Sequence, residues 1–330
     1  MRWSVIKAKM FSRCQRKWYY YELAAHARTK DDVRREAYFL KQLQSISAWR
    51  GSLVDTVIHN FITPRLLSHT LPNENETLEY ALNLMKSQIS FGKERKHRSR
   101  ALTKSNSGNS YCAFYDLEYD GKLKEESLQN AEREIVSALK NLLSSELLRN
   151  IAETNQYVIS QRSLSFSPFE DVRVVCVPDM VVFFEDKSPL IIDWKVHFFG
   201  NSDAWLQLGI YSIALSQITP HKDFPANFSE LKGNASQIDL VEFQLLKNVE
   251  RKYSITEQDV LDIEDYILRS IVQMRNLVNG RSFNDLDINS FQTARNPQTC
   301  GRCQFKKLCW LEDENHKPEH MQQTLFEVLK

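Results

Sequence analysis

The chain has 330 residues, of which 42% are hydrophobic and 26% charged, so it is long enough for one large domain or two ordinary ones and has the composition of a soluble globular protein. Its 43 Lys and Arg residues against 42 Asp and Glu residues give a formal charge of +1, which excludes a global field that draws the protein to nucleic acid and leaves only local patches for such binding. There is no basic and apolar leader and no apolar run near the roughly 20 residues of a spanning helix, so we expect a cytoplasmic protein with no membrane segment.

The N-terminal segment, residues 1–50, contains one cysteine in an aromatic and basic setting. Cys14 is followed by the string from Gln15 to Tyr21, which mixes two basic residues with one Trp and three Tyr. Such aromatic residues either pack in a core or dock against nucleic acid, and packing is the commoner role. In a reducing compartment, cysteines are metal ligands or core residues more often than disulfides.

Residues 51–150 have the pattern of a helical region. Apolar residues at helical spacing predict a helix over residues 51–61, which carries His59 and which Pro64 ends or kinks. A second amphipathic helix is predicted over residues 125–149. Between the two helices, basic side chains concentrate in residues 93–104, which form either a mobile basic loop or a loop that closes over a phosphate backbone.

Residues 151–282 have the pattern of an α/β core. Runs rich in β-branched and aromatic residues predict strands, and near-continuous apolar runs indicate a central strand covered on both faces. Thr256 and Asp259 form a plausible capping box for the last helix, which Gly280 ends. Strands are predicted at residues 172–184, 190–196, 238–246 and 252–255, and helices at residues 202–218 and 256–279. We therefore expect an α/β fold with a mixed central sheet flanked by helices.

Three more cysteines are grouped near the C-terminus. Their spacing is Cys300-x2-Cys303-x5-Cys309, in a loop-like segment that we assign to residues 283–316. Together with Cys14, soft thiolates at this spacing suit zinc or an iron–sulfur cluster, and spacing does not choose between them. Either metal would tie the two ends of the chain together.

The residues that suggest chemistry lie in the hairpin predicted from the first two strands. Residues two apart in a strand share a face, so Asp193 and Lys195 point together, and Asp179 on the preceding strand is expected opposite them. Converging carboxylates repel and raise each other's pKa unless a cation lies between them, which favours a divalent metal site. Lys195 would orient the attacking water and stabilise phosphate charge. The alternative is a surface ion pair on an edge strand, which the otherwise apolar strand disfavours.

Three further polar residues are candidates for the same site. His59 carries an imidazole, a good ligand for manganese, although a lone histidine on a helix is ordinarily a core or surface residue. Gln207 and Tyr211 are four apart on a predicted helix, so they face the same way and suit a phosphate or a base edge. Such a pair is also common on half-buried helices without any function.

The combination of these motifs, in this order, resembles the PD-(D/E)XK nucleases of the RecB-like branch. Within that branch the chain is similar to the iron–sulfur group, which includes CRISPR-associated exonucleases, the nuclease domain of AddB and that of the eukaryotic replication helicase-nuclease. The resemblance spans residues 14–309 and rests on His59, Pro178-Asp179, Asp193-Trp194-Lys195 and Gln207-x3-Tyr211, enclosed by Cys14 and the three C-terminal cysteines.

The resemblance implies a restriction-endonuclease-like core with a helical insertion and an iron–sulfur lobe that joins the two termini. It also implies a role for each motif residue, with the backbone carbonyl of Trp194 as a further candidate ligand. The implied ligands of Mg²⁺ or Mn²⁺ are His59, Asp179 and Asp193; the catalytic lysine is Lys195; the residues that contact DNA or brace the site are Gln207 and Tyr211; and the ligands of a structural 4Fe-4S cluster, with zinc less favoured, are Cys14, Cys300, Cys303 and Cys309.

Two departures from the family pattern concern the metal shell. Gln161 stands near the place of a frequent glutamate, and Cys176 replaces a glycine that often stands three residues before the first aspartate. The function we expect is metal-dependent hydrolysis of DNA, as an exonuclease on single-stranded ends in repair, recombination or defence, with a helicase or other complex subunit among the candidate partners. The alternatives are a DNA-end-binding subunit with little catalysis and a zinc-stapled structural protein.

The last segment, residues 317–330, is polar and has the pattern of a flexible tail. Gln322, Leu325 and Phe326 resemble the Gln-x-x-Leu-Phe peptide by which bacterial DNA polymerases and repair enzymes dock on the sliding clamp. The adjacent Leu and Phe side chains would bury apolar surface in a pocket of that partner. The alternative is a short terminal helix that packs these side chains and Leu329 on its own domain.

Overall fold

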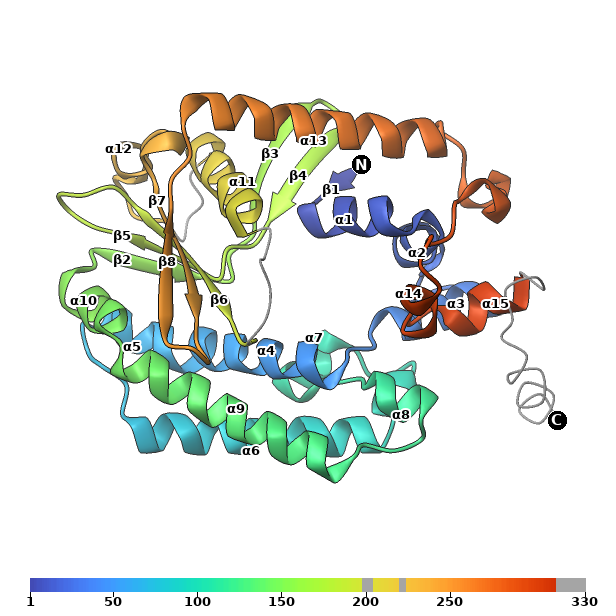
Figure 1. The fold of residues 1–330 in the computed structure, drawn as a ribbon, viewed down its shortest axis with the longest axis horizontal. Coiled ribbons are helices and arrows are strands. Elements are labelled where there is room, and N and C mark those ends of the chain that lie inside the picture. The colour runs from blue at the N-terminus through green and yellow to red at the C-terminus, as the bar shows by residue number, and fades with distance from the viewer. Residues whose placement is uncertain (198–203, 220–223, 313–330) are drawn as a thin grey trace. The chain divides into compact units, whose positions relative to one another are not determined.

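The computed structural model of the chain describes residues 1–197, 204–219 and 224–312 (Figure 1). The chain divides into two compact units: the first comprises residues 1–5 and 44–272, and the second comprises residues 6–43 and those from 273 onward. Among the helices of the described ranges, none is long and apolar enough to cross a membrane.

The first unit contains a five-stranded mixed sheet with the order β2-β5-β6-β7-β8 and a smaller sheet with the order β1-β4-β3. In the larger sheet all neighbours are antiparallel except β6 and β7, which are parallel and are joined through helix α11. The strands are β1 (Arg2–Trp3), β2 (Tyr157–Ser160), β3 (Leu164–Phe169), β4 (Val172–Cys176), β5 (Met180–Phe183), β6 (Leu190–Lys195), β7 (Asp239–Gln244) and β8 (Val249–Tyr253).

The helices of the first unit lie on both sides of the larger sheet. On one side, α4, α6 and α9 share a core with strand residues such as Val182, Ile192 and Val241, and on the other side lies α11 (Figure 1). The helices are α4 (Ile46–Val57), η2 (Ile58–Ile62), α5 (Thr63–Leu67), α6 (Glu74–Lys93), η3 (Lys96–Arg98), α7 (Lys104–Ser107), η4 (Gly108–Ser110), α8 (Tyr115–Tyr119), α9 (Glu125–Ser144), α10 (Glu146–Thr154), α11 (Ala204–Gln217), α12 (Phe228–Leu231), η5 (Ala235–Gln237) and the larger part of α13 (Glu257–Val278). Helices therefore cover both faces of the sheet, and every residue of β5 is buried.

Helix α11 is held close to α13 by a glycine. A Cβ atom added to Gly209 would lie 2.5 Å from Cδ1 of Ile263, well inside van der Waals contact. Only a residue without a side chain permits this approach, and it fixes the helix that carries Gln207 and Tyr211.

Two predicted elements are interrupted in the structure. The run at residues 172–184, expected as one strand, is split into β4 and β5, which belong to different sheets, because Pro178 between them has no N–H for a strand ladder. The helix expected over residues 125–149 ends at Ser144, and the Ser145 hydroxyl accepts a hydrogen bond from Leu148 N at 3.2 Å to cap α10.

The capping box of α13 is confirmed, since Thr256 N donates to Asp259 Oδ2 at 2.7 Å and Asp259 N donates to Thr256 Oγ1 at 3.2 Å.

The basic stretch at residues 93–104 folds differently from the loop that its composition predicts. It contains the end of α6 and the short helix η3, and its charges are used locally. Arg98 forms an ion pair with Glu118 at 2.7 Å, Arg95 Nη2 donates to Leu117 O at 2.6 Å, and Lys96 pairs with Glu94 at 2.9 Å. These contacts engage three of the basic side chains, while Lys93, Arg100 and Lys104 of the same stretch are exposed.

The second unit consists of short helices around an aromatic core. Tyr19 contacts Phe291 with a ring separation of 4.8 Å, and Tyr20 stacks on Phe305 at 5.6 Å. The aromatic string after Cys14 therefore packs, as its composition favours. The elements are α1 (Val5–Arg13), α2 (Gln15–Trp18), η1 (Tyr19–Ala24), α3 (Asp32–Lys41), the last turns of α13, η6 (Phe283–Asp285), η7 (Ile288–Ser290), α14 (Pro297–Gly301) and α15 (Lys306–Glu312).

Candidate active site

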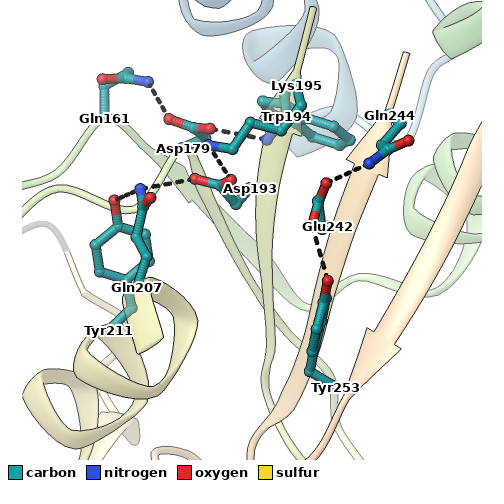
Figure 2. A network of polar contacts seen from close by, with 10 residues as sticks. All are labelled: Gln161, Asp179, Asp193, Trp194, Lys195, Gln207, Tyr211, Glu242, Gln244 and Tyr253. Atoms are coloured by element: carbon teal, nitrogen blue, oxygen red, sulfur yellow. Dashed lines mark hydrogen bonds and ion pairs between the residues drawn. The ribbon is translucent and has the colours of Figure 1, made fainter. Parts of the chain in front are cut away.

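A row of polar side chains crosses the five-stranded sheet on the face toward α11. Strand pairing places Asp193 of β6 beside Glu242 of β7. Continuing the antiparallel registers by one residue places Asp179 beside Asp193 and Gln161 beside Asp179. Figure 2 shows these side chains together with those that contact them. The sheet thus gathers three carboxylates from three adjacent strands.

Asp193 is the buried centre of this row. Its residue is 1% exposed, Gln207 Nε2 donates a hydrogen bond to its Oδ1 at 3.0 Å, and Lys195 Nζ forms an ion pair with its Oδ2 (Figure 2). The shared strand face of Asp193 and Lys195 follows from the period of two in a strand. The orientation of this carboxylate is therefore fixed by two side chains.

Asp179 lies at the turn before β5 and is held from two sides. Gln161 Nε2 donates to its Oδ1 at 3.1 Å, and the backbone N–H of Trp194 donates to its Oδ2 at 2.8 Å. The hydrogen bond to Trp194 joins the beginning of β5 directly to β6. Gln161, which stands where a glutamate is frequent in the resembled family, thus serves as a hydrogen-bond donor to the first aspartate.

A third aspartate reaches the cluster from helix α4, and the sequence did not lead us to it. Burial of Asp55, with a further contribution from the Asp193 carboxylate, raises the pKa of Asp55 to about 7, against an opposing effect of Lys195. Asp55 is the single acidic residue in the apolar stretch between Gly51 and Phe61. This isolated charge is the sequence feature by which Asp55 could be identified.

The pKa values of the other two aspartates are raised as well. Burial is the largest cause for Asp179, whose pKa lies well above its usual value, and the Asp193 and Asp55 carboxylates add to it. Burial also raises the pKa of Asp193, although Lys195 opposes the shift. The Asp193 carboxylate raises the pKa of both Asp55 and Asp179, so these buried carboxylates form a site that positive charge stabilises.

Lys195 supplies part of that charge. Burial lowers its pKa, but Asp193, Asp179 and Asp55 outweigh burial, so the pKa of Lys195 is raised above its usual value and the side chain is charged at neutral pH. The ammonium group lies at the edge of the cluster, with its side chain 21% exposed. It is accessible to a phosphate that approaches the carboxylates.

Gln207 and Tyr211 are brought to the cluster by α11. Gln207 Nε2 donates to Tyr211 Oη at 2.5 Å as well as to Asp193. Burial and then the charges of Asp193 and Asp179 raise the pKa of Tyr211 well above its usual value, so the phenol is neutral. Their spacing of four residues on a helix gives this shared direction, and their contacts show that they brace Asp193.

His59 is placed differently from the expectation that it ligates a metal with Asp179 and Asp193. Its exposed imidazole has its Nδ1 2.7 Å from Ser160 Oγ, and no contact with the three aspartates is found among the described residues. His59 lies in η2, a π-helical turn between α4 and α5. Asp55 is thus a further candidate ligand, and the role of His59 as a ligand stays a prediction.

Glu242 is a second residue that the sequence analysis missed. It is fully buried on β7, where Gln244 Nε2 donates to its Oε1 at 2.7 Å and Tyr253 Oη donates to its Oε2 at 2.9 Å (Figure 2). Its charge raises the pKa of the neighbouring Asp193. A lone carboxylate in an apolar strand is the same kind of signal as Asp55, but its place beside Asp193 depends on the register of β6 and β7, which the fold sets.

The four cysteines of the predicted cluster lie in the second unit. Cys14, Cys300, Cys303 and Cys309 line one small cavity, together with Lys17 and Lys306. Burial raises the pKa of Cys300 and Cys303, and the pKa of Cys309 to about 12. No disulfide joins these cysteines, which are free thiols.

Neither the aspartate cluster nor the cysteine cluster has its side chains arranged around a single metal position. Within residues 1–197, 204–219 and 224–312, no group of three or more His, Cys, Asp or Glu side chains is arranged to hold a metal ion as it stands. The four cysteines lie near one another, and so do the three aspartates. In neither cluster do the side chains converge on one point.

Comparison with protein families decides the classification. The family model of the PD-(D/E)XK nuclease superfamily matches residues 2–310, nearly the whole chain. The chain belongs to the PD-(D/E)XK nuclease superfamily. No curated protein gives a significant match. The α/β architecture with mixed sheets flanked by helices agrees with the restriction-endonuclease-like fold of this superfamily.

Membership of the PD-(D/E)XK superfamily gives the general chemistry. Its members are nucleases that act on DNA and typically use Mg²⁺ or Mn²⁺, although some members are catalytically inactive. In this chain Asp179 and the run Asp193-Trp194-Lys195 are adjacent, since Trp194 N donates to Asp179 and Lys195 pairs with Asp193.

Proposed function

We propose that this protein is a metal-dependent deoxyribonuclease that degrades single-stranded DNA from its ends. The observation that carries the proposal is that three aspartates, Asp179 and Asp193 from the sheet and Asp55 from helix α4, lie close enough to Lys195 for their charges to raise its pKa. A structural role alone gives no reason to collect three carboxylates whose pKa values burial raises in every case. The preference for single-stranded ends comes from the resemblance to exonucleases of the RecB-like branch.

The aspartates fit a hard divalent cation by their chemistry. Carboxylate oxygens are the preferred ligands of Mg²⁺ and Mn²⁺, and the raised pKa values of Asp55, Asp179 and Asp193 identify the place where a cation is most stabilising. These three residues would hold it. When bound, the ion supplies Lewis-acid chemistry, which polarises the phosphate and acidifies water.

The remaining steps belong to the side chains around the aspartates. Lys195 brings a positive charge to the phosphate oxygens and stabilises the negative charge that develops as the phosphodiester bond breaks. Gln207 fixes Asp193 through Oδ1, and Trp194 N–H fixes Asp179 through Oδ2. Such supporting contacts hold catalytic groups in their productive geometry without reorganisation during the reaction.

The proposal includes a structural 4Fe-4S cluster in the second unit. Cys14, Cys300, Cys303 and Cys309 would hold it, and their common cavity with two lysines supports this. Thiolate ligands are negatively charged, so lysines beside them favour the deprotonated form that metal binding requires. Spacing alone does not choose the metal, and the preference for iron over zinc comes from the resemblance of the whole motif set to the iron–sulfur group.

The test of the proposed activity is a digestion of end-labelled DNA. We expect the anaerobically purified protein to shorten single strands in the presence of Mn²⁺, and Asp193→Ala and Lys195→Ala each to abolish the reaction. Asp186→Ala is the matched control, because Asp186 is exposed in the turn of the same hairpin. Full activity of both active-site variants, or no cleavage by the wild-type protein, would contradict the proposal.

A further inference from the structure

A polar groove in the second unit has no part in the proposed catalytic site. It has a volume of about 1020 Å³ and is formed by the end of α1, the start of α2, the last turns of α13 and residues 292–299. This volume lies at the top of the roughly 300–1,000 Å³ range of small-molecule sites. The groove is large enough for a stretch of an extended polymer.

The lining of the groove is positively charged. Arg13 and Arg295 are both exposed in it, and none of the described residues that line it is Asp or Glu, although the chain has 42 acidic residues. In the described part of the chain, neither guanidinium group has an ion-pair partner. These two arginines differ in this from Arg95 and Arg98, whose groups are occupied.

The amide side chains of the groove are biased toward hydrogen-bond donation. Gln15 Oε1 accepts a hydrogen bond from Gln292 N at 3.0 Å, and Asn296 Oδ1 accepts one from Gln298 N at 2.9 Å. Both oxygens are thus used within the fold, and the NH₂ groups of the same amides remain as donors. Gln273 and Asn276 on α13 add two exposed amides. Phosphate oxygens only accept hydrogen bonds, so arginines and amide NH₂ groups are matched to them.

The wall of the groove is held in place by the core of the second unit. Arg16 N donates to Gln292 O at 3.1 Å, and the neighbouring Phe291 is fully buried against Tyr19. The polar residues 292–296 therefore extend from a fixed aromatic anchor. A site that is formed before binding loses less entropy when a ligand enters.

We propose that this groove binds the phosphodiester backbone of single-stranded DNA, as a second site of contact for the strand that the nuclease acts on; the idea rests on the proposed function. A positively charged concave groove with many hydrogen-bond donors is how proteins follow a single-stranded backbone without reading its sequence. Arg13 and Arg295 make the ionic contacts, and the amides of Gln15 and Asn296 make neutral ones.

The experiment measures binding without cleavage. The full-length protein is titrated with a fluorescent oligothymidylate in the presence of EDTA over a range of salt concentrations. For the double variant Arg13→Gln with Arg295→Gln, we expect about tenfold weaker binding at low salt. Because each phosphate contact on a single strand contributes about 0.7 to the slope of log Kobs against log salt, we also expect that slope to fall by about 1.4.

The matched control removes the same charge elsewhere in the second unit. Arg28 and Lys30 are exposed and do not line the groove, so Arg28→Gln with Lys30→Gln is expected to keep the affinity and salt slope of the wild type. Melting curves of both double variants show whether the fold is intact. If both variants lose affinity equally, binding follows net charge and the groove proposal is overturned.

Two further outcomes separate this inference from the proposed activity. If thymidine 5′-monophosphate displaces the oligonucleotide at equal phosphate concentration, the groove is a mononucleotide site and the proposal is overturned. If the wild-type protein cleaves DNA but the groove variant binds with unchanged affinity and slope, the groove fails and the nuclease stands. If the protein binds through the groove but never cleaves, the proposed activity fails and the groove stands.

Discussion

The carboxylates of Asp55 on α4 and Asp193 on β6 lie close enough that Asp193, together with the larger effect of burial, raises the pKa of Asp55 to about 7. Helix α4 is therefore part of the candidate site as well as a layer of the core. This relationship distinguishes Asp55 from His59, the residue on the same segment that we first expected at the metal.

The first prediction concerns this choice between Asp55 and His59. We expect Asp55→Ala to reduce DNA cleavage more than the roughly 10–100-fold that follows loss of a residue supporting a ligand, because Asp55 would hold the cation itself. His59→Ala removes a hydrogen bond to Ser160, so it should cost about 1 kcal/mol of stability and retain most of the activity. Rates of cleavage in Mn²⁺ decide between them. If Asp55→Ala keeps full activity and His59→Ala is inactive, His59 holds the cation and Asp55 does not.

The second prediction is a pH dependence of stability. Since the pKa of Asp55 is raised in the folded state, the folded protein binds more protons than the unfolded chain between the ordinary pKa of 3.8 and about 7. The stability of the protein in EDTA, without bound metal, therefore falls as pH rises through this window. The raised pKa values of Asp179 and Asp193 contribute in the same direction. Melting temperatures in EDTA measure the fall.

Mn²⁺ should reverse that loss at and above neutral pH. Asp55→Asn should flatten the pH dependence in EDTA and also weaken the stabilisation by Mn²⁺, because it removes both the repulsion and a ligand. Stability in EDTA that rises across the same window would show that the aspartates are not raised in pKa.

The third prediction concerns Gln207, which donates to Asp193 at 3.0 Å and to Tyr211 at 2.5 Å. Gln207→Ala frees the Asp193 carboxylate to rotate, so we expect a loss of about 10–100-fold in cleavage with a small change in melting temperature. Tyr211→Phe keeps the packing and the Gln207–Asp193 hydrogen bond, so its effect should be smaller. Equal losses in the two variants would argue that Tyr211 contacts DNA directly.

The fourth prediction tests the cluster. Cys14→Ala should lower iron content, the brown colour that bleaches on reduction, and the melting temperature, because Cys14 lines the same cavity as the three C-terminal cysteines. Cys176→Ala makes the same change in the buried end of β4 and should leave iron content unchanged. If the purified protein contains zinc in place of iron, the cysteines bind zinc. If the Cys14→Ala protein keeps its full metal content, Cys14 is not a ligand.

The fifth prediction concerns residues 313–330, which lie outside the described residues together with Gln322, Leu325 and Phe326. If the tail docks on a sliding clamp, a bacterial clamp should be pulled down by the wild-type protein and lost with Leu325→Ala and Phe326→Ala, while nuclease activity is unchanged. Clamp binding that survives both substitutions would place the contact elsewhere.

The sequence by itself determined the features that depend on neighbouring residues. The shared face of Asp193 and Lys195 follows from the strand period, the common direction of Gln207 and Tyr211 follows from the helix period, and the capping box of α13 follows from Thr256 and its neighbours. These patterns are encoded within a few residues, so they can be interpreted without a fold.

Only the tertiary structure decided which distant residues meet. Asp55 is not among the ligands that the sequence predicts, and only the packing of α4 brings its carboxylate close enough to Asp193 for its pKa to be raised. Glu242 lies beside Asp193 because β6 and β7 pair in one particular parallel register. The basic residues Arg95 and Arg98 are occupied by partners that become neighbours when α8 folds against α6 and η3. Long-range contacts such as these depend on how all the apolar faces are buried at once, and no local pattern records that outcome.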